Sequence, residues 1–348
     1  MEKINLKELS GTEIHDFIKE INLPDFRARQ ILHWLYQRYA QSIGEITEFS
    51  LELRGWLSEN AYISNHLLLD RRISEDGAEK FLFGLYDDES IESVLIPDEN
   101  RLTLCVSSQA GCSLGCIFCA TGRLGFRRNL RDYEIVDQII SVSRIIAPRR
   151  ITNIVFMGMG EPLLNFQNTV EALSRISGLM KISPRRITVS TSGIVPKIAE
   201  LAKNAPQAGL AISLNATTDW IRDYIMPVNK TYPLKQLIEA CRRVPLPPRR
   251  KITFEYVMLK GINDSADDAR RLVNLLKGIP SKVNLIPLNP YKNCGLQSSE
   301  EKTIFRFQEI LLKGNLTAFI RKSKGQDIGA ACGQLQANYL ISHDNSIS

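Results

Sequence analysis

The chain has 348 residues, of which 44% are hydrophobic and 24% are charged, and its formal net charge at pH 7 is +6. These values are typical of a globular protein with room for one large and one small domain, and they exclude a chain that is disordered throughout. No apolar run is long enough to span a bilayer, and the charged amino terminus lacks a secretory signal pattern. We therefore expect a cytoplasmic protein with no membrane partner.

The first third of the chain divides into two predicted parts. Residues 1–65 show helical periodicity, most clearly over 25–43, where Phe26, Ile31, Trp34 and Leu35 fall near one face. This pattern predicts a small helical amino-terminal domain. Over 80–97 the apolar period shortens toward two between turn residues, which predicts a small strand region over 66–100 that bridges to the main domain.

Short β-rich runs alternate with amphipathic segments over 101–348. We expect helices at 131–146, 265–279 and 302–314, and strands at 102–108, 151–158, 186–192, 209–216, 251–259, 282–288 and 316–322. The alternation predicts right-handed βαβ units and a parallel sheet that is closed or partly closed into a barrel. Reactive groups of such barrels lie at the carboxyl ends of the strands, where several polar motifs occur.

Three cysteines, Cys112, Cys116 and Cys119, follow the first predicted strand of this domain. A structural zinc site needs four ligands, generally as two pairs, and an iron–sulfur cluster is also usually held by four cysteines. The triplet therefore favours a cluster with one iron left open to another ligand. Structural zinc, or cysteines with no shared role, is the alternative.

The spacing Cys-x3-Cys-x2-Cys, with Phe118 before the last cysteine, is similar to the signature of the radical S-adenosylmethionine (SAM) superfamily. The resemblance implies one [4Fe-4S] cluster per chain, held by these three cysteines, whose fourth iron binds SAM and supplies an electron to break a carbon–sulfur bond. It also implies the fold class, a partial parallel (β/α)6-type α/β barrel with a small helical amino-terminal domain.

A longer set of motifs resembles the RlmN family of dual-specificity RNA methyltransferases nearly end to end. The motifs are LPDFRARQILHWLY (23–36), ESVLIP (92–97), CVSSQAGCSLGCIFCATG (105–122), FMGMGEPLLN (156–165), ITVSTSGIVP (187–196), MPVNKTYPL (226–234), EYVMLKGIND (255–264), NLIPLNP (284–290) and DIGAACGQL (327–335). The resemblance implies methylation of adenine C2 in 23S ribosomal RNA and in tRNA.

The resemblance also implies the roles of three further residues. Cys332 takes a methyl group from one SAM, and a second SAM is consumed to make the carbon radical that adds to adenine C2. Cys105 forms a disulfide with Cys332 as the product leaves, and Glu92 matches the proton acceptor. By themselves, the two cysteines are typical of small buried side chains, and Glu92 of a surface carboxylate on a strand.

Contacts with SAM are expected from seven residues that match the family: Gly160, Glu161, Ser190, Ser213, Leu214, Asn215 and Asn289. Asn215 is a departure, because the family often has histidine there. Both side chains donate and accept hydrogen bonds, so we expect SAM binding to be retained, while the form of this contact is left open.

The partners implied by the resemblance are 23S rRNA, tRNA and an external electron donor such as flavodoxin or ferredoxin, with the protein itself a monomer. Arginine-rich segments at 126–131, 148–150, 184–186, 247–251 and 320–324 are suited to phosphate contacts. Two alternatives are a Cfr-type enzyme that methylates C8 of the same ribosomal adenine, and a noncatalytic iron–sulfur protein that binds RNA or transfers electrons. Against the first alternative, the motifs GMGEPLLN and IPLNPY resemble the C2 enzymes more closely. Against the second, a noncatalytic iron–sulfur protein has no use for a cysteine that accepts a methyl group.

Overall fold

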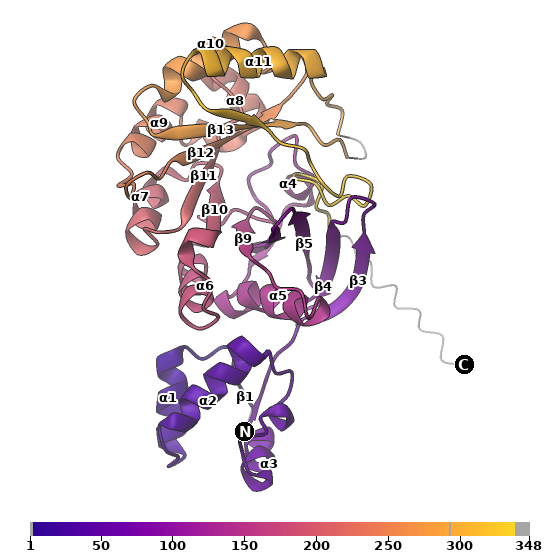
Figure 1. Ribbon diagram of the computed structural model, residues 1–348, viewed down its shortest axis with the longest axis vertical. Coiled ribbons are helices and arrows are strands. Elements are labelled where there is room, and N and C mark those ends of the chain that lie inside the picture. The colour runs from indigo at the N-terminus through magenta and orange to yellow at the C-terminus, as the bar shows by residue number, and fades with distance from the viewer. Residues whose placement is uncertain (1–2, 292–293, 338–348) are drawn as a thin grey trace, which may run out of the picture.

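The computed structural model describes residues 3–291 and 294–337. Figure 1 shows a helical unit at the amino terminus, a long twisted sheet above it, and a layer of helices along the outside of the sheet. The helical unit contains α1 (Gly11–Glu20), α2 (Phe26–His33) and α3 (Leu51–Asn60), and the short strands β1 (Ile4–Asn5) and β2 (Ala61–Tyr62) pair with each other. None of the helices in the described ranges is both long enough and apolar enough to cross a membrane.

The amino-terminal helices begin at local signals in the sequence. Ser10 accepts a hydrogen bond from the Glu13 amide at 3.2 Å, and the Glu13 carboxylate accepts one from the Ser10 amide at 2.7 Å, so α1 begins with a capping box. Ile31 and Leu35 are fully buried, as their periodicity predicts. Phe26, the first residue of α2, is 42% exposed, and the guanidinium of Arg27 lies 4.8 Å from the centre of its ring.

A sheet of ten strands forms the main domain of the described chain, in the order β14-β13-β12-β11-β10-β9-β6-β5-β4-β3. From β6 to β14 the neighbouring strands are parallel, which confirms the predicted parallel α/β architecture. These strands are β6 (Arg101–Cys105), β9 (Asn153–Phe156), β10 (Ile187–Thr191), β11 (Gly209–Ser213), β12 (Ile252–Met258), β13 (Ser281–Pro287) and β14 (Ala318–Ile320). The edge strands β14 and β3 are not neighbours, so the barrel is partly open.

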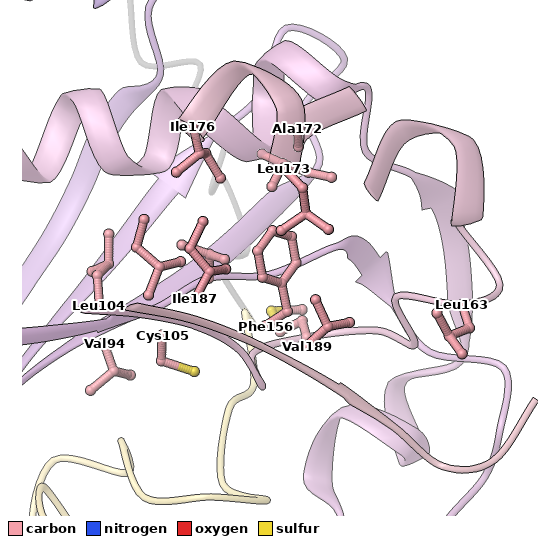
Figure 2. Close-up of a cluster of buried hydrophobic side chains, with 14 of the residues drawn as sticks. Val94, Leu104, Cys105, Phe156, Leu163, Ala172, Leu173, Ile176, Ile187 and Val189 are labelled. Atoms are coloured by element: carbon pink, nitrogen blue, oxygen red, sulfur yellow. The ribbon is translucent and has the colours of Figure 1, made fainter. Parts of the chain in front are cut away.

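Helices connect the parallel strands and bury one face of the sheet. They are α5 (Asp132–Ile145), α6 (Phe166–Gly178), α7 (Val195–Asn204), α8 (Asp219–Ile225), α9 (Leu234–Arg242), α10 (Ala266–Leu276) and α11 (Glu301–Lys313). In Figure 2, Leu104, Phe156 and Ile187 point from the sheet toward Leu173 and Ile176 of α6. Because both sides of this layer are apolar, the core holds the strands in register and fixes the positions of their carboxyl ends.

Three antiparallel strands extend the sheet beyond β6. They are β3 (Leu67–Ile73), β4 (Glu79–Gly84) and β5 (Ser90–Asp98), and β5 pairs with β6. Strands occur at 80–97, as the sequence predicts, and they continue the main sheet through the pairing of β5 with β6. The sequence has no comparable signal for β3, whose residues are mostly exposed on an edge.

Buried charged groups join the helical unit to the main domain. Lys7 forms a buried ion pair with Asp137 of α5. Arg175 of α6 pairs with Asp132 and donates hydrogen bonds to the Lys7 carbonyl at 2.9 Å and to the Tyr36 hydroxyl at 2.6 Å. These contacts hold the amino-terminal helices against α5 and α6.

Candidate active site

The three cysteines of the triplet lie in a loop enclosed by the hairpin of β7 (Gln109–Gly111) and β8 (Phe126–Asn129), next to the short helix α4 (Ala120–Leu124). The Cys112 amide donates to the Gly125 carbonyl at 2.9 Å, which closes the loop. Gly111 has φ +74°, and a Cβ there would lie 1.9 Å from the Gly125 oxygen. Only glycine fits at this turn, so the sequence itself directs the chain into the cysteine loop.

The chemistry of the three thiols fits an iron–sulfur cluster. Cys112 and Cys116 are buried and Cys119 is partly buried. Burial raises the pKa of each thiol, to about 12 for Cys112, and the proximity of the other cysteines raises the pKa of Cys112 and Cys116 further. Such thiols ionise when a metal cation binds them, and thiolates are the usual ligands of iron–sulfur clusters. In residues 3–291 and 294–337, no three His, Cys, Asp or Glu side chains are grouped closely enough to hold a single metal ion.

Arg222 of α8 is fully buried beside this loop. It donates to the carbonyls of Ser192 at 2.7 Å, Ser213 at 3.0 Å and Leu214 at 2.9 Å, and so links the ends of β10 and β11. Burial lowers the pKa of Arg222 to about 10, while the nearby Cys116 favours its charged form. The same helix holds the cysteine loop, because the Ile225 carbonyl accepts from the Ile117 amide at 3.1 Å.

Sequence reasoning missed Arg222. Arginine is rarely buried, and a buried guanidinium leaves no periodic trace in a sequence. The sequence does hold one indication of its importance, because Arg222 lies four residues before the family motif MPVNKTYPL.

Gly160 and Glu161 lie in the loop that follows β9. Gly160 has φ +95°, and a Cβ there would lie 2.5 Å from the Cβ of Gln109, so the backbone passes close to β7. The buried Glu161 carboxylate accepts hydrogen bonds from the amides of Leu163 at 3.0 Å and Ser192 at 2.7 Å. Burial raises the pKa of Glu161, and these amides favour its charged form. Glu161 therefore joins the β9 loop to the end of β10.

The other predicted SAM residues lie at the ends of β10, β11 and β13. Ser190 is partly buried within β10, and Ser213 and Leu214 are held through their carbonyls by Arg222. Asn215 is buried with φ +58°, a conformation that asparagine tolerates well. Its amide oxygen accepts from the Val257 amide at 2.8 Å and its nitrogen donates to the Met226 sulfur at 3.1 Å. The Asn215 side chain is thus occupied by the protein, and its carbonyl also accepts a hydrogen bond from the Asn263 side chain at 2.7 Å.

The C-terminal segment 325–337, which contains Cys332, lies against the cysteine loop. The Ala120 amide donates to the Gly333 carbonyl at 2.7 Å, and the Thr121 hydroxyl donates to the Leu335 carbonyl at 2.8 Å. Asn289, after β13, donates to the Cys332 carbonyl at 3.2 Å. Figure 1 shows this yellow segment beside α4 and the strands β4 and β5. Residues more than 200 positions apart in sequence are therefore neighbours at the candidate site.

Cys105, Cys332 and Glu92 are brought together at this place. Cys105 ends β6 and pairs with Val94, so Glu92, two residues before Val94, is on the same face of the sheet as Cys105. In Figure 2, Val94 and Cys105 point away from α6, toward the pale yellow C-terminal segment. Burial raises the pKa of the Cys105 thiol, and the nearby Cys332 raises it further.

Cys332 itself is exposed to solvent. All seven cysteines are free. No disulfide is therefore present, and the expected Cys105–Cys332 bond is not found in this structure.

Glu92 is buried on β5, which excludes a surface carboxylate. One carboxylate oxygen lies 3.0 Å from the Lys80 ammonium, and the other accepts from the Gln336 amide at 2.7 Å. Burial raises the pKa of Glu92, and Lys80 opposes that rise. A carboxylate with a raised pKa is suited to general base chemistry near neutral pH.

Some of the predicted phosphate-binding arginines have acidic partners in the fold. Arg128 bonds to Asp87 and to Glu134 at 2.7 Å, and Arg149 bonds to Glu79 at 2.6 Å. Part of the positive charge of the segments at 126–131 and 148–150 is therefore balanced within the protein, and less of it is left to bind phosphate than their composition indicates.

Two family models match the chain. The model of the radical SAM superfamily matches residues 106–273, which include the cysteine loop and the strands from β9 to β12. The model of the ribosomal RNA large subunit methyltransferase N-terminal domain matches residues 4–63, which include α1, α2 and α3. The two matches fall on the two parts of the fold described above.

Relatives of nearly full length give a more specific assignment. The chain is 49% identical to the dual-specificity RNA methyltransferase RlmN of Geotalea uraniireducens, covering 97% of both chains. It is 51% identical to that of Geobacter sulfurreducens, covering 96% of this chain and 92% of the relative. A solved radical SAM methyltransferase from Sphaerobacter thermophilus is similar with a TM-score of 0.92 and 41% identity, covering 96% of this chain and 99% of the other. The chain belongs to the RlmN family of RNA methyltransferases, within the radical SAM superfamily.

Proposed function

We propose that this protein methylates C2 of an adenine in 23S rRNA and in tRNA, through a methyl group carried by Cys332. The observation that carries the proposal is the meeting of Cys332, Cys105 and Glu92 beside the cysteine loop. Relatives about half identical to the chain over nearly full length are dual-specificity RNA methyltransferases. Adenine C2 is an electron-poor carbon that cannot displace a methyl group from SAM directly, so a carrier and radical chemistry are both required.

A [4Fe-4S] cluster on three cysteines and SAM are the cofactors of this chain, as of its superfamily. We assign the cluster to Cys112, Cys116 and Cys119, whose thiols suit iron. When bound, the cluster and SAM supply the methyl group and the radical chemistry that activates it. The residues that we expect to contact SAM lie at or near the carboxyl ends of the parallel strands. They are Gly160, Glu161, Ser190, Ser213, Leu214, Asn215 and Asn289. Glu161, together with Arg222 of α8, holds the strand ends in place.

The residue roles follow from atoms that lie near one another. The Cys332 sulfur takes a methyl group and loses its proton. The radical step removes one hydrogen atom from this methyl group, so its carbon is joined to adenine C2 as a methylene. A Glu92 oxygen accepts the C2 proton, and the unpaired electron left on the ring would return to the bound cluster. The Cys105 sulfur gives up its proton and bonds to the Cys332 sulfur while the carbon–sulfur bond breaks, and the released methylene takes up a proton to become the methyl group on the RNA. The resulting disulfide is returned to two thiols by an external reductant.

We assign the action of the protein to the cytoplasm, where both RNA substrates occur. The exposed Arg127, Arg185 and Arg186 are suited to phosphate contacts. We further propose a monomer that receives electrons from a flavodoxin or ferredoxin.

The proposed activity is tested by anaerobic reconstitution of the cluster, followed by incubation with SAM, a reductant and each RNA. Nucleoside analysis is expected to show 2-methyladenosine with the wild type and with Cys241→Ala, which removes a buried cysteine of α9 outside the site. Cys332→Ala is expected to give none. Recovery of 8-methyladenosine, or of methylated RNA from the Cys332 variant, would contradict the proposal.

A further inference from the structure

Lys80 of β4 lies on the same sheet face as Glu92 and Cys105. The register pairs Lys80 with Val94, and Val94 with Cys105. Side chains at paired positions of antiparallel strands share a face, and so do residues two apart on one strand, such as Glu92 and Val94. A lysine therefore lies next to the proposed base, on the same face of the sheet as the proposed disulfide partner.

The contacts of Lys80 join this face to the C-terminal segment on both sides of Cys332. The Lys80 ammonium lies 3.0 Å from one Glu92 oxygen and donates to the Gly329 carbonyl at 3.2 Å. The other Glu92 oxygen accepts from the Gln336 amide at 2.7 Å. Gly329 precedes Cys332 and Gln336 follows it, so one buried ion pair fastens the carrier cysteine at both ends of its segment.

The same ion pair determines whether Glu92 can act as a base. Burial favours the protonated acid, which cannot take another proton. The positive charge of Lys80 and the Gln336 amide favour the carboxylate, and Arg72 on β3 does so more weakly. Without Lys80, the effect of burial on Glu92 would be opposed much less, and the protonated acid would be favoured.

Building on the proposed function, we propose that Lys80 is a positioning residue that keeps the Glu92 carboxylate ready for the C2 proton and fastens the Cys332 segment to it. When a Glu92 oxygen takes that proton, the acid becomes neutral. Its ion pair with Lys80 and its charge-assisted hydrogen bond from Gln336 both weaken. Proton removal therefore loosens the carrier segment in the step that precedes cleavage by Cys105.

Three Lys80 variants separate charge from tethering. Lys80→Met removes the charge and the hydrogen bond to Gly329, Lys80→Gln removes the charge but keeps an N–H donor, and Lys80→Arg keeps both. Lys324→Met is the matched control, because Lys324 donates to the Pro97 carbonyl at 2.6 Å and tethers the same segment to β5. Lys324 is not among the groups with the largest effects on Glu92.

The experiment uses the reconstituted holoenzyme and follows two quantities. One is the decay rate of the protein–RNA adduct as a function of pH, and the other is hydrogen–deuterium exchange over 325–337. We expect Lys80→Met and Lys80→Gln to move the acid limb of the decay profile to higher pH by about one to three pH units. Below that limb, each pH unit slows decay about tenfold. Lys80→Arg restores the profile.

The exchange measurement separates the two effects of Lys80. Exchange over 325–337 should rise in Lys80→Met and in Lys324→Met, with the decay profile of the Lys324 variant unchanged. An unchanged profile in both Lys80→Met and Lys80→Gln would overturn the inference, as would an equal shift in Lys324→Met. If the wild type itself forms no adduct with RNA, the proposed function fails first, so the two failures are distinguishable.

Discussion

At the scale of single residues, the site depends on backbone positions that accept no side chain. Gly111 shows this most directly, because its positive φ and its close approach to the Gly125 carbonyl coincide. Gly115, in the same loop, has φ +64°, but a Cβ added there would have no other atom within 4 Å. Comparison of the two glycines separates the cost of backbone strain from the cost of a clash.

Gly111→Ala is expected to lower the free energy of unfolding by about 3 kcal/mol, because strain and overlap with the Gly125 oxygen add together. Gly115→Ala should cost about 1 kcal/mol, since only the left-handed backbone is strained. Urea unfolding monitored by circular dichroism measures both. Equal losses in the two variants would show that the close approach at Gly111 has no energetic consequence.

Arg222 provides a second prediction at this scale. Arg222→Met leaves the carbonyls of Ser192, Ser213 and Leu214 buried without their donor, and we expect a loss of about 3 kcal/mol in unfolding free energy. Arg222→Lys keeps the charge and part of the hydrogen bonding, so its loss should be smaller. Iron retained per chain after reconstitution should follow the same order. A methionine variant with wild-type stability and iron content would contradict the role assigned to Arg222.

At the scale of elements, the candidate site is formed where the cysteine loop, the antiparallel extension and the C-terminal segment meet. Gly333 lies at this junction with φ +84°, and a Cβ there would lie 3.0 Å from the Phe118 carbonyl of the cysteine loop. The segment is held from the other side by Asp327, which accepts from the Ser74 hydroxyl at 2.6 Å. The position of Cys332 is therefore a property of three elements together.

Gly333→Ala is expected to push the C-terminal segment away from the cysteine loop and to slow methylation of Cys332 by at least about tenfold, the equivalent of roughly 1.4 kcal/mol. Gly278→Ala is the control, because Gly278 has φ +82° with open space around it. Mass spectrometry of the Cys332 peptide after incubation with SAM gives the extent of methylation. Equal methylation in the two variants would contradict the close packing of Gly333 against the loop.

The strands of the barrel could be predicted from sequence because each is a short β-rich run between amphipathic segments, as at 252–258 and 281–287. The cysteine triplet was equally visible, since its spacing is local. The contacts that hold the C-terminal segment around Cys332 could not be predicted from local patterns, because hydrogen bonds such as that from the Gln336 amide to Glu92 join residues 244 positions apart. The hydrogen bonds that the side chains of Asn215 and Glu161 accept from the amides of Val257 and Ser192 could not be predicted either, because these partners are also distant in the sequence.

At the scale of the whole molecule, the helical unit is joined to the barrel through buried charges. The Lys7–Asp137 pair is almost completely shielded from water, and the His66 amide also donates to Asp137 at 2.9 Å. Burial lowers the pKa of Lys7, and the Asp137 carboxylate opposes this. A buried charge without its partner would lower the stability of the fold, so the pair favours one placement of the helical unit on the main domain.

Lys7→Met is expected to lower unfolding free energy by about 3–5 kcal/mol, because it leaves the Asp137 carboxylate buried without its cation. Lys3→Met, at an exposed lysine that donates to the Ser58 carbonyl, should change it by less than about 0.5 kcal/mol. Chemical denaturation and protease cleavage between the two parts report the difference. Equal stability of the two variants would show that the buried pair does not hold the joint.

The most direct test of the central claim uses Cys105→Ala, which should allow the Cys332 carbon to join the RNA but prevent its release. Reconstituted variant protein is incubated with SAM, reductant and RNA, and the digested adduct is sequenced by mass spectrometry. The predicted result is an adenosine attached through one carbon to the sulfur of Cys332. An adduct at another residue, or complete release of methylated RNA by the Cys105 variant, would contradict the claim.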